Sequence, residues 1–503
     1  MPSETLIWLA ILLPVFGALG IWAAGEARRD LRELITIATA VALFIVILRL
    51  LGRVLDGARP EIAGFELFAG IRFGLAIEPL GMLFATIAAT LWSVNSVYSI
   101  GYMRGNDEPR QTNFYICFAV AISSAMGVAF SANLVTLFLF YEILTVSTYP
   151  LVAHKGSADA KRNAGLYLMI LLATSMMLLL PAIVWTAVAA GTTEFAPGGI
   201  LASTGMSAGA ATVLMVLFVF GIGKAAVMPV HSWLPAAMVA PTPVSALLHA
   251  VAVVKAGVFT VVKVFVYVFG IDYLAETGAS AWVVYIAGAT LLIASLIALT
   301  HDNLKKRLAF STVSQLSYVV MAAAVATPLA IIGAILHIAA HAVSKITLFF
   351  AAGSLHTAGH LDYVSQLDGA GRRMPWTMGA FAVGALAMIG LPPTAPFLSK
   401  WFMLEGYLSA EHLFAFGVIV LSTVLNACYF LPILHRAFFR EAPLPSAAHP
   451  VHGEGPWPSV VALTVTAGFT LLLFLFPDTV HRLALAVVEA PQPVAETALG
   501  ARP

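Results

Sequence analysis

The stretch FVFGIGKAAVMPVHSWLPAAMVAPTPVSALLHAVAVVKAG, residues 218–257, interrupts a long apolar run with prolines and lysines. Proline removes a helix hydrogen bond and clashes with the preceding turn. Inside a membrane, backbone broken in this way survives only where protein buries it or where it lines a cavity. The stretch therefore predicts a broken membrane helix, with Lys224 just before Pro229 and Pro235, and then a second helix that carries Lys255.

A second interruption follows the same pattern in the other half of the chain. The run AMIGLPPTAPFLSKWFMLEGY, residues 387–407, places Pro392, Pro393 and Pro396 just before Lys400. Paired discontinuous helices in two halves of a chain are typical of transporters built from internal repeats. A proline can also merely kink a helix for packing, but a lysine beside each break favours a functional role.

The composition indicates a membrane protein. Of 503 residues, 60% are hydrophobic and 10% are Asp, Glu, Lys or Arg, whereas soluble chains carry about 25% charged residues. No soluble fold could bury so much apolar surface. A net charge of +1 argues against a nucleic-acid-binding surface. Cys117 and Cys428 lie far apart in apolar runs, which excludes a disulfide framework and a thiolate metal cluster.

Apolar segments of about 20 residues can cross the hydrocarbon layer, and the chain has fourteen candidates. The predicted fold class is an all-α polytopic membrane protein with fourteen transmembrane helices. Their centres lie near Leu12, Ala42, Ala89, Ala121, Tyr141, Met176, Leu217, Val258, Leu291, Val319, Ala342, Leu386, Leu421 and Thr466. Fifteen basic residues fall in the loops of one side and five in the loops and tail of the other. The positive-inside rule therefore predicts both termini on the outer side.

Between the spans, residues 53–78 form one of the longest polar stretches and alternate polar with apolar residues around glycines. This pattern predicts a small hairpin on the outer face, although an unstructured loop explains the composition equally well. Near the span ends, Arg49 and Lys263 are expected to extend their charges to the membrane interface.

Five ionisable residues lie deep within the predicted spans. They are Glu142, Lys224, Lys255, Lys345 and Lys400. Each costs about 2.5–3.5 kcal/mol at the bilayer centre, a cost that a purely structural protein does not need to carry. One carboxylate cannot pair with four lysines, so buried ion pairs explain the set poorly. Burial disfavours the charged form of a lysine and a nearby carboxylate favours it, so lysines between these influences can load and release protons.

Histidines extend this pattern in the segment LHIAAHAVSKITLFF, residues 336–350, where His337, His341 and Lys345 recur every four residues. They form a stripe about 12 Å long on one helix face, and imidazoles suit proton transfer near neutral pH. Alternatively, each histidine hydrogen-bonds a neighbouring helix. Metal binding is disfavoured, because no nearby carboxylate or thiol completes a site.

Four segments together resemble the antiporter-like subunits of respiratory complex I and of multisubunit cation/proton (Mrp-type) antiporters. They are KAAVMPVHSWLPAAMVAPTPVSALLHAVAVVKAGVF (224–259), HDNLKKRLAFSTVSQLSYV (301–319), HAVSKITLFFAAGSL (341–355) and GLPPTAPFLSKW (390–401). The resemblance runs from about residue 78 to residue 440, and the combined motifs are highly specific. It implies fourteen helices, with two inverted five-helix repeats and two broken helices.

Mapped onto this chain, the resemblance implies four segments. Residues 1–110 would hold helices one to three with the outer hairpin, and 111–270 the first repeat with broken helix seven. Residues 280–440 would hold the second repeat with broken helix twelve, and 441–503 an inner loop, the last helix and an outer tail.

The resemblance also assigns roles by matching motif. Glu142 resembles the carboxylate that pairs with the lysine of broken helix seven, here Lys224. Lys255 resembles the central lysine of helix eight, and His249 resembles a histidine proposed as a relay or gate. The second half contributes His337, His341 and Lys345 on helix eleven and Lys400 as the outlet residue of helix twelve.

These roles imply a proton-translocating subunit of a multisubunit Na⁺ or K⁺/proton antiporter, a multi-pass protein of the bacterial inner (plasma) membrane. A proton would be taken up near Lys224 and Lys255, pass along a row of lysines, histidines and water, and leave near Lys400. The Glu142–Lys224 pair would act as the gate. Chain length and Lys400 favour the Mrp D subunit or a complex I N-type subunit, whereas PTPVSALLHA is closer to the L-type and Mrp A-type motif.

Two alternative functions remain open at this point. The chain could be the proton-pumping arm of complex I or of a hydrogenase-type redox complex, or the membrane anchor of a carbon-concentrating complex. The expected partners are other membrane subunits and the lipid bilayer, with protons and Na⁺ or K⁺ as the transported ions. No nucleic acid, cofactor, metal or catalytic residue is expected.

Overall fold

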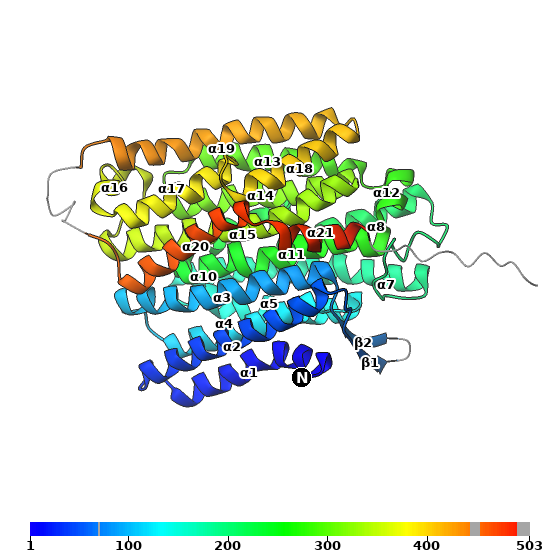
Figure 1. Ribbon diagram of the computed structural model, residues 1–503, viewed down its shortest axis with the longest axis horizontal. Coiled ribbons are helices and arrows are strands. Elements are labelled where there is room, and N and C mark those ends of the chain that lie inside the picture. Colours follow the sequence, from blue (N-terminus) through cyan, green and yellow to red (C-terminus); the bar gives the residue numbers. More distant parts are fainter. Residues whose placement is uncertain (69–70, 443–452, 490–503) are drawn as a thin grey trace, which may run out of the picture.

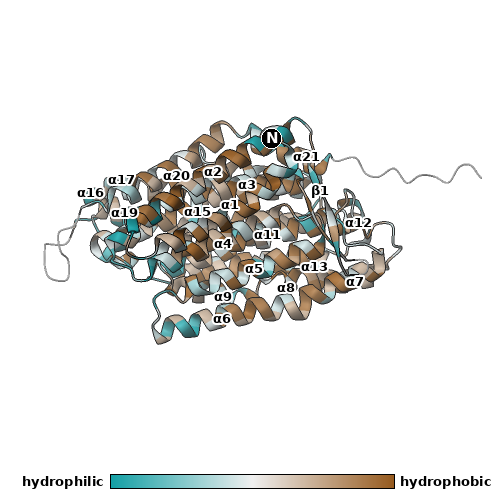
Figure 2. Cartoon of the chain, turned by 90° about the horizontal axis from the view of Figure 1, so that it is seen from below, coloured by the Kyte–Doolittle hydropathy of each residue, from teal (hydrophilic) through white to brown (hydrophobic). Residues whose placement is uncertain are grey.

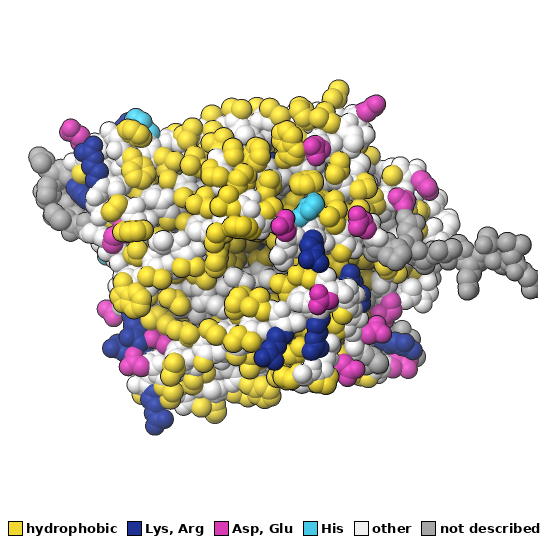
Figure 3. Space-filling view, viewed as in Figure 1, with side chains coloured by type: hydrophobic (Ala, Val, Ile, Leu, Met, Phe, Trp, Pro, Cys, Tyr) yellow, Lys and Arg dark blue, Asp and Glu magenta, His cyan; other side chains and the backbone are white. Residues whose placement is uncertain are grey.

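Long apolar helices run along the longest dimension of the molecule and pack side by side into a bundle (Figure 1). The computed structural model describes residues 1–68, 71–442 and 453–489. Hydrophobic residues follow the helices along their length, and hydrophilic residues gather toward the helix ends (Figure 2). On the face shown in Figure 3, hydrophobic side chains cover most of the surface and most charged side chains lie toward its two ends. A bundle that crosses hydrocarbon requires this distribution.

Twelve helices in the described part of the chain are long and apolar enough to cross a membrane. They are α1 (Ser3–Ala24), α2 (Arg29–Leu55), α3 (Pro79–Gly105), α4 (Gln111–Ala129), α5 (Leu134–Val152), α6 with α7 (Ala158–Thr174 and Leu180–Ala190), α10 with α11 (Thr242–Ala246 and Val253–Lys263), α13 (Ala281–Thr300), α14 (Leu304–Val325), α15 (Pro328–Gly359), α19 (Leu413–Phe439) and α20 (Trp457–Leu475). They coincide with twelve of the fourteen predicted spans. The other two, predicted near Leu217 and Leu386, fall on the shorter apolar helices α8 (Ala208–Gly221) and α17 (Pro375–Ile389).

The first predicted interruption is present after α8. This helix ends at Gly221, and single turns together with the four-residue α9 (Trp233–Ala236) carry the chain to α10. Pro229 lies in the irregular segment between α8 and α9, and Pro235 lies within α9.

The second interruption follows α17, which ends at Ile389. Pro392 and Pro393 occupy the irregular segment before α18 (Ala395–Ser409). Pro396 is in the first turn of α18, where a backbone N–H has no partner within the helix and its absence costs little. The prolines therefore separate the two helical parts in both halves, as the sequence predicts.

Helix α15 is central to the packing. It contacts α14, α17, α18 and α20, and also α3, α10 and α11. The most apolar 18-residue stretch of this helix is 94% buried inside the protein. Polar side chains on this helix therefore have protein, not lipid, as their surroundings, so α15 can hold a buried polar stripe.

Two strands form the predicted hairpin. β1 (Glu61–Phe68) pairs antiparallel with β2 (Ile71–Ala76), and the rings of Phe65 and Phe73 stack with centroids 5.2 Å apart. The hairpin prediction is confirmed over the alternative of an unstructured loop.

The C-terminal segment contains a helix that the sequence reasoning missed. α21 (Asp478–Val488) lies where only a tail was expected, and it packs against α3 and α15. Much of the predicted inner loop (441–456) and the end of the predicted tail, with Arg502, lie outside the described residues. The short α12 (Ile271–Thr277) and α16 (Ala370–Arg373) lie near opposite ends of the bundle (Figure 1).

Two arginines, Arg32 on α2 and Arg104 on α3, join α2 to its neighbours at one end of the bundle. Arg32, on α2, is 1% exposed. Its guanidinium donates to the Glu26 carboxylate at 2.9 Å, the Gln111 side-chain oxygen at 2.7 Å and the Thr112 hydroxyl at 3.2 Å. Nearby, Arg104 of α3 donates to Asp30 at 2.5 Å and to Glu33. These bonds fix α2 against α3 and α4.

We expect Arg32→Ala to destabilise this end of the bundle, because each hydrogen bond to a charged group contributes about 1.5–3 kcal/mol. The thermal transition of the detergent-purified protein, followed by the monomer peak in size-exclusion chromatography, should fall by several degrees. Arg29→Ala removes the same charge from an exposed position one turn away and should leave the transition unchanged. Equal transitions for the two variants would contradict this account.

Candidate functional site

The centre of the site is a contact between two helices from different halves of the chain. The Lys255 ammonium on α11 lies 2.7 Å from Nδ1 of His341 on α15. Both side chains are fully buried. An ammonium can donate to the lone pair of a neutral imidazole, so a proton can be shared between these two nitrogens.

His337 continues the site one turn along α15. Its ring stacks with that of His341, with centroids 6.0 Å apart and planes 9° from parallel. Nδ1 of His337 lies 2.8 Å from the Ser399 hydroxyl, and Nε2 lies 3.1 Å from the Gln315 side-chain oxygen. The predicted stripe is therefore connected to α18 on one side and to α14 on the other.

Lys400 follows Ser399 on α18, and the second break supplies its acceptors. Its ammonium donates to the carbonyls of Ile389 at 2.8 Å and Met388 at 3.2 Å. These carbonyls belong to the last turn of α17, and the last carbonyls of a helix lack donor partners within it. The partial negative charge at a helix C-terminus also stabilises a cation there. A lysine beside a break therefore has acceptors that an unbroken helix would not offer.

Two residues complete the surroundings of Lys400. The ammonium lies 5.0 Å from the ring centroid of Tyr318, whose ring is in turn 5.5 Å from that of His337. Gly390 has a positive φ of 90°, and a Cβ there would lie 2.8 Å from Cδ of Lys400. Only glycine therefore lets the chain turn so close to this side chain.

Lys224, in the first break, is also bound by neutral acceptors. Its ammonium donates to the Tyr141 carbonyl at 2.9 Å and the Thr145 hydroxyl at 2.5 Å, and it lies 3.1 Å from the centroid of the Tyr141 ring. Both carboxylate oxygens of Glu142 are buried without a hydrogen-bond partner among the described residues. Glu142 and Lys224 therefore form no hydrogen bond or ion pair in this structure, and their pairing stays a prediction.

Backbone packing connects the break to α11. A Cβ on Gly257 would lie 2.4 Å from the Lys224 carbonyl carbon and the Ala225 nitrogen. The two segments touch backbone to backbone, so α11, the helix that carries Lys255, packs directly on the break. No hydrogen bond between Lys224 and Lys255 occurs in the described part of the chain.

Lys345 and His249 occupy different positions from the rest of the predicted set. The Lys345 ammonium donates to the Ser311 hydroxyl at 2.8 Å, and Ser311 also accepts from Tyr429 at 3.1 Å. Neither ring nitrogen of His249 has a hydrogen-bond partner among the described residues. The His249 ring packs instead on Phe349, with centroids 4.7 Å apart. Its role as a relay stays a prediction.

Sequence reasoning missed several partners on α14. Ser311, Gln315 and Tyr318 are spaced by four and three residues, so they share one face of this helix. That face meets the stripe on α15 through Lys345 and His337. The spacing inside the motif STVSQLSY could have revealed it. Ser399, Tyr141 and Thr145 carry no comparable signal.

One prediction about a span end was wrong. Lys263 does not extend to the interface but is fully buried. Its ammonium lies 2.5 Å from the Glu78 carboxylate and 2.9 Å from the Ser131 carbonyl. A carboxylate at the start of α3 offsets the cost of burying this lysine, and Glu78 is too far away in sequence for a local pattern to reveal the pair.

The deep lysines have neutral partners rather than carboxylates. Within the described ranges, none of the four deep lysines forms an ion pair with Asp or Glu. The same residues include no group of three His, Cys, Asp or Glu side chains that could hold a metal ion. What they contain is a series of four titratable groups, Lys255, His341, His337 and Lys400. Lys255 hydrogen-bonds His341, the two imidazoles stack, and the Tyr318 ring lies near both His337 and Lys400.

Comparison with solved structures shows that this fold is known. The chain matches a structure of the Mrp complex from Dietzia sp. with a TM-score of 0.85, 20% identity and coverage of 97% of both chains. It matches the membrane-bound sulfane sulfur reductase, an archaeal respiratory membrane complex, with a TM-score of 0.82, 20% identity and coverage of 96% of this chain and 98% of that one.

Relatives in sequence come from two kinds of complex. NADH-quinone oxidoreductase subunit N of Desulforudis audaxviator is 32% identical over 376 residues, which are 74% of each chain. The A/B component of a probable K⁺/H⁺ antiporter of Rhizobium meliloti is 30% identical over 404 residues, which are 76% of this chain and 38% of that longer protein. Residues 131–426 match the family model described as NADH:quinone oxidoreductase/Mrp antiporter, TM. The chain belongs to this transmembrane family of NADH:quinone oxidoreductases and Mrp antiporters.

Proposed function

We propose that this chain is the proton-translocating subunit of a multisubunit membrane complex that exchanges Na⁺ or K⁺ for protons. The observation that carries the proposal is the buried row of Lys255, His341, His337 and Lys400. The row crosses α11, α15 and α18. Each member can bind and release a proton, and the hydrocarbon layer gives a structural protein no reason to keep them there.

Glu142 and Lys224 together act as the gate that controls proton transfer into the row. In the present arrangement Lys224 is bound by a carbonyl and a hydroxyl, and the Glu142 oxygens have no described partner. A buried carboxylate without a partner is costly, so Glu142 has a strong tendency to acquire one. A shift that brings it to Lys224 would change how firmly Lys224 holds its proton, and that change would be passed to Lys255.

The surroundings of Glu142 support partnership with other membrane subunits. Leu139, Ile143 and Val146, on the same helix, are all exposed. Glu142 therefore borders an apolar face of α5 that lipid or another membrane helix covers. Relatives of this chain are named as subunits of larger complexes, which agrees with such partners. The excess of basic residues in alternate loops supports an inner-membrane orientation with both termini outside.

A second candidate is the proton-pumping arm of a redox complex. It is favoured by the relative named as subunit N, which aligns with 74% of both chains, whereas the antiporter relative is matched over only 38% of its length. In that case electron transfer in another subunit would drive the same row of residues, and no cation would be exchanged.

The antiport proposal predicts cation-driven proton movement in everted vesicles that contain the whole complex. Adding NaCl or KCl to energised vesicles should collapse the pH gradient, as read by a quenched acridine dye, with no respiratory substrate of this complex present. Vesicles from a deletion strain provide the background. If the pH gradient responds only to an electron donor, the antiport proposal is wrong and the redox-driven pump is supported instead.

The row predicts that Lys255→Met and Lys400→Met each lower proton transport by about tenfold or more, since each removes one titratable step. Assembly of the complex, checked by native gels, should be preserved. Lys161→Met removes an exposed lysine at the start of α6 and should transport at the normal rate. If both row variants transport protons at the normal rate, the chain does not conduct protons through this row and a role as a membrane anchor remains.

The gate predicts that Glu142→Gln and Lys224→Ala abolish transport while the complex still assembles. Glutamine keeps the size of Glu142 but cannot carry charge. Glu276→Gln, at an exposed site on α12, is the matched carboxylate control. An assembled Glu142→Gln complex that transports at the rate of this control would refute the gate.

A further inference from the structure

A polar pocket of about 580 Å³ lies apart from the buried row, where α5 and α15 end and α6 and α14 begin. One wall is the α9 region of the first break, from Pro235 to Val239. The other lining residues include Lys155, Asp159, Asn163, His301, Lys305, Lys306, His356 and Asp362. Ligand pockets in proteins typically measure about 300–1,000 Å³, so this one can hold a small molecule or the head group of a lipid.

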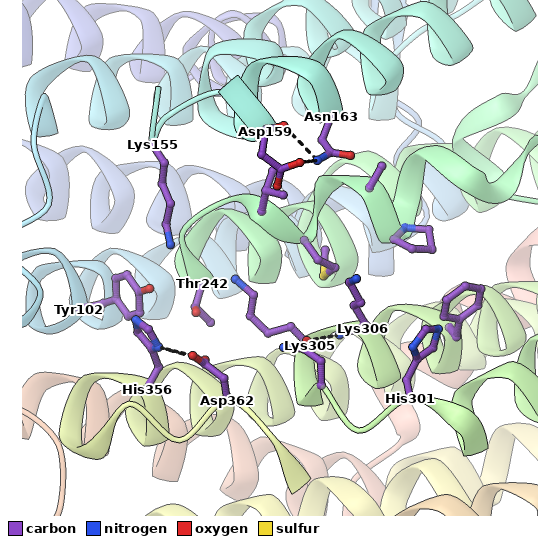
Figure 4. Close-up of a pocket in the computed structure, with 16 residues that line it drawn as sticks. Tyr102, Lys155, Asp159, Asn163, Thr242, His301, Lys305, Lys306, His356 and Asp362 are labelled. Atoms are coloured by element: carbon purple, nitrogen blue, oxygen red, sulfur yellow. Dashed lines mark hydrogen bonds and ion pairs between the residues drawn. The ribbon is translucent and has the colours of Figure 1, made fainter. Parts of the chain in front are cut away.

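Three lysines extend into this pocket from opposite sides (Figure 4). Lys155 comes from the segment between α5 and α6, and Lys305 and Lys306 come from the first turn of α14. The Lys305 ammonium donates to the Ala240 carbonyl at 2.7 Å. The ammonium groups of Lys155 and Lys306 have no hydrogen bond or ion pair to any described residue.

The acidic residues of the pocket are already engaged. Asp362 accepts from His356 at 3.0 Å, and the Asp159 side chain accepts from Asn163 at 3.0 Å. Burial alone would raise the pKa of Asp362, but the His356 hydrogen bond and nearby lysines hold it below its usual range. Asp362 therefore remains ionised beside His356, and Lys155 and Lys306 are left without a partner among the described residues.

The charge of the walls indicates what the pocket accepts. Three ammonium groups and two carboxylates line the cavity. Because both carboxylates already have hydrogen-bond partners, the free ammonium groups of Lys155 and Lys306 favour a multivalent anion placed between them. Lysine is a common phosphate ligand because it acts as a compact, mobile positive charge. His301 and Asn303 add hydrogen-bonding groups on the same side as Lys305.

We propose that this pocket binds a phosphate-bearing anion, held between Lys155 on one side and Lys305 and Lys306 on the other. The ligand is either a soluble phosphate compound or the head group of an anionic phospholipid, because both present the same group to the lysines. The site does not depend on proton transport by the buried row. Since Lys305 also binds the Ala240 carbonyl beside the first break, an occupant would contact the segment that carries α9 into α10.

The test uses the full-length protein in nanodiscs of zwitterionic phosphatidylcholine. Pyrophosphate binding is measured by calorimetry, and retention of added phosphatidic acid is measured by native mass spectrometry. The variant is Lys155→Gln with Lys306→Gln. Its matched control, Lys161→Gln with Arg162→Gln, removes the same charge from exposed positions on α6 that do not line the pocket. Lys155→Arg with Lys306→Arg retains the charge.

We expect the pocket variant to bind its probe about tenfold more weakly, with the control and the arginine variant within about twofold of the natural protein. If the pocket variant loses only pyrophosphate binding, the ligand is a soluble phosphate compound. If it loses only phosphatidic acid binding, the ligand is a lipid. The proposal is overturned if the natural protein binds neither probe, or if the pocket variant, shown folded by an unchanged thermal transition, binds as the control does.

Discussion

Hydrocarbon offers no hydrogen-bond partner, so a lysine buried in a membrane protein must find its acceptors inside the protein. This constraint explains the shape of the bundle around the site. Lys400 takes the carbonyls that α17 leaves free where it ends, and Lys224 takes a carbonyl and a hydroxyl of α5. The broken helices are thus more than kinks. The second break exposes backbone acceptors at the depth where a charged side chain needs them.

The same constraint accounts for the neutral character of the partners. Lys255 meets an imidazole, Lys345 a hydroxyl and Lys400 two carbonyls. A carboxylate at each position would hold the ammonium charge firmly in place. Neutral acceptors solvate the charge without trapping it, so the proton can leave. Lys263, which does meet the carboxylate of Glu78, lies outside the row and serves as a contrast: it joins α11 to the start of α3.

Much of this arrangement could be predicted from the sequence, and the failures have physical causes. Prolines beside lysines located both breaks, and a four-residue spacing located the stripe of His337, His341 and Lys345. The carbonyl partners of Lys400 could not be foreseen, because backbone acceptors have no residue type. The Lys263–Glu78 pair joins positions far apart in the chain. α21 has 11 residues, so a search for apolar segments of about 20 residues does not find it. Whether Glu142 and Lys224 meet depends on side-chain placement that composition does not determine.

The direction of the row has an electrical consequence. Lys255, His341, His337 and Lys400 lie on three neighbouring helices. The two histidines at the centre of the row are four residues apart on α15, which corresponds to about 6 Å along the helix. This is about one fifth of a hydrocarbon layer roughly 30 Å thick. Moving one charge through the whole layer corresponds to about 2.3 kcal/mol per 100 mV, so the step between the two histidines accounts for about 0.5 kcal/mol per 100 mV. If the row carries protons as proposed, most of the effect of the voltage therefore falls on the steps outside this pair of histidines.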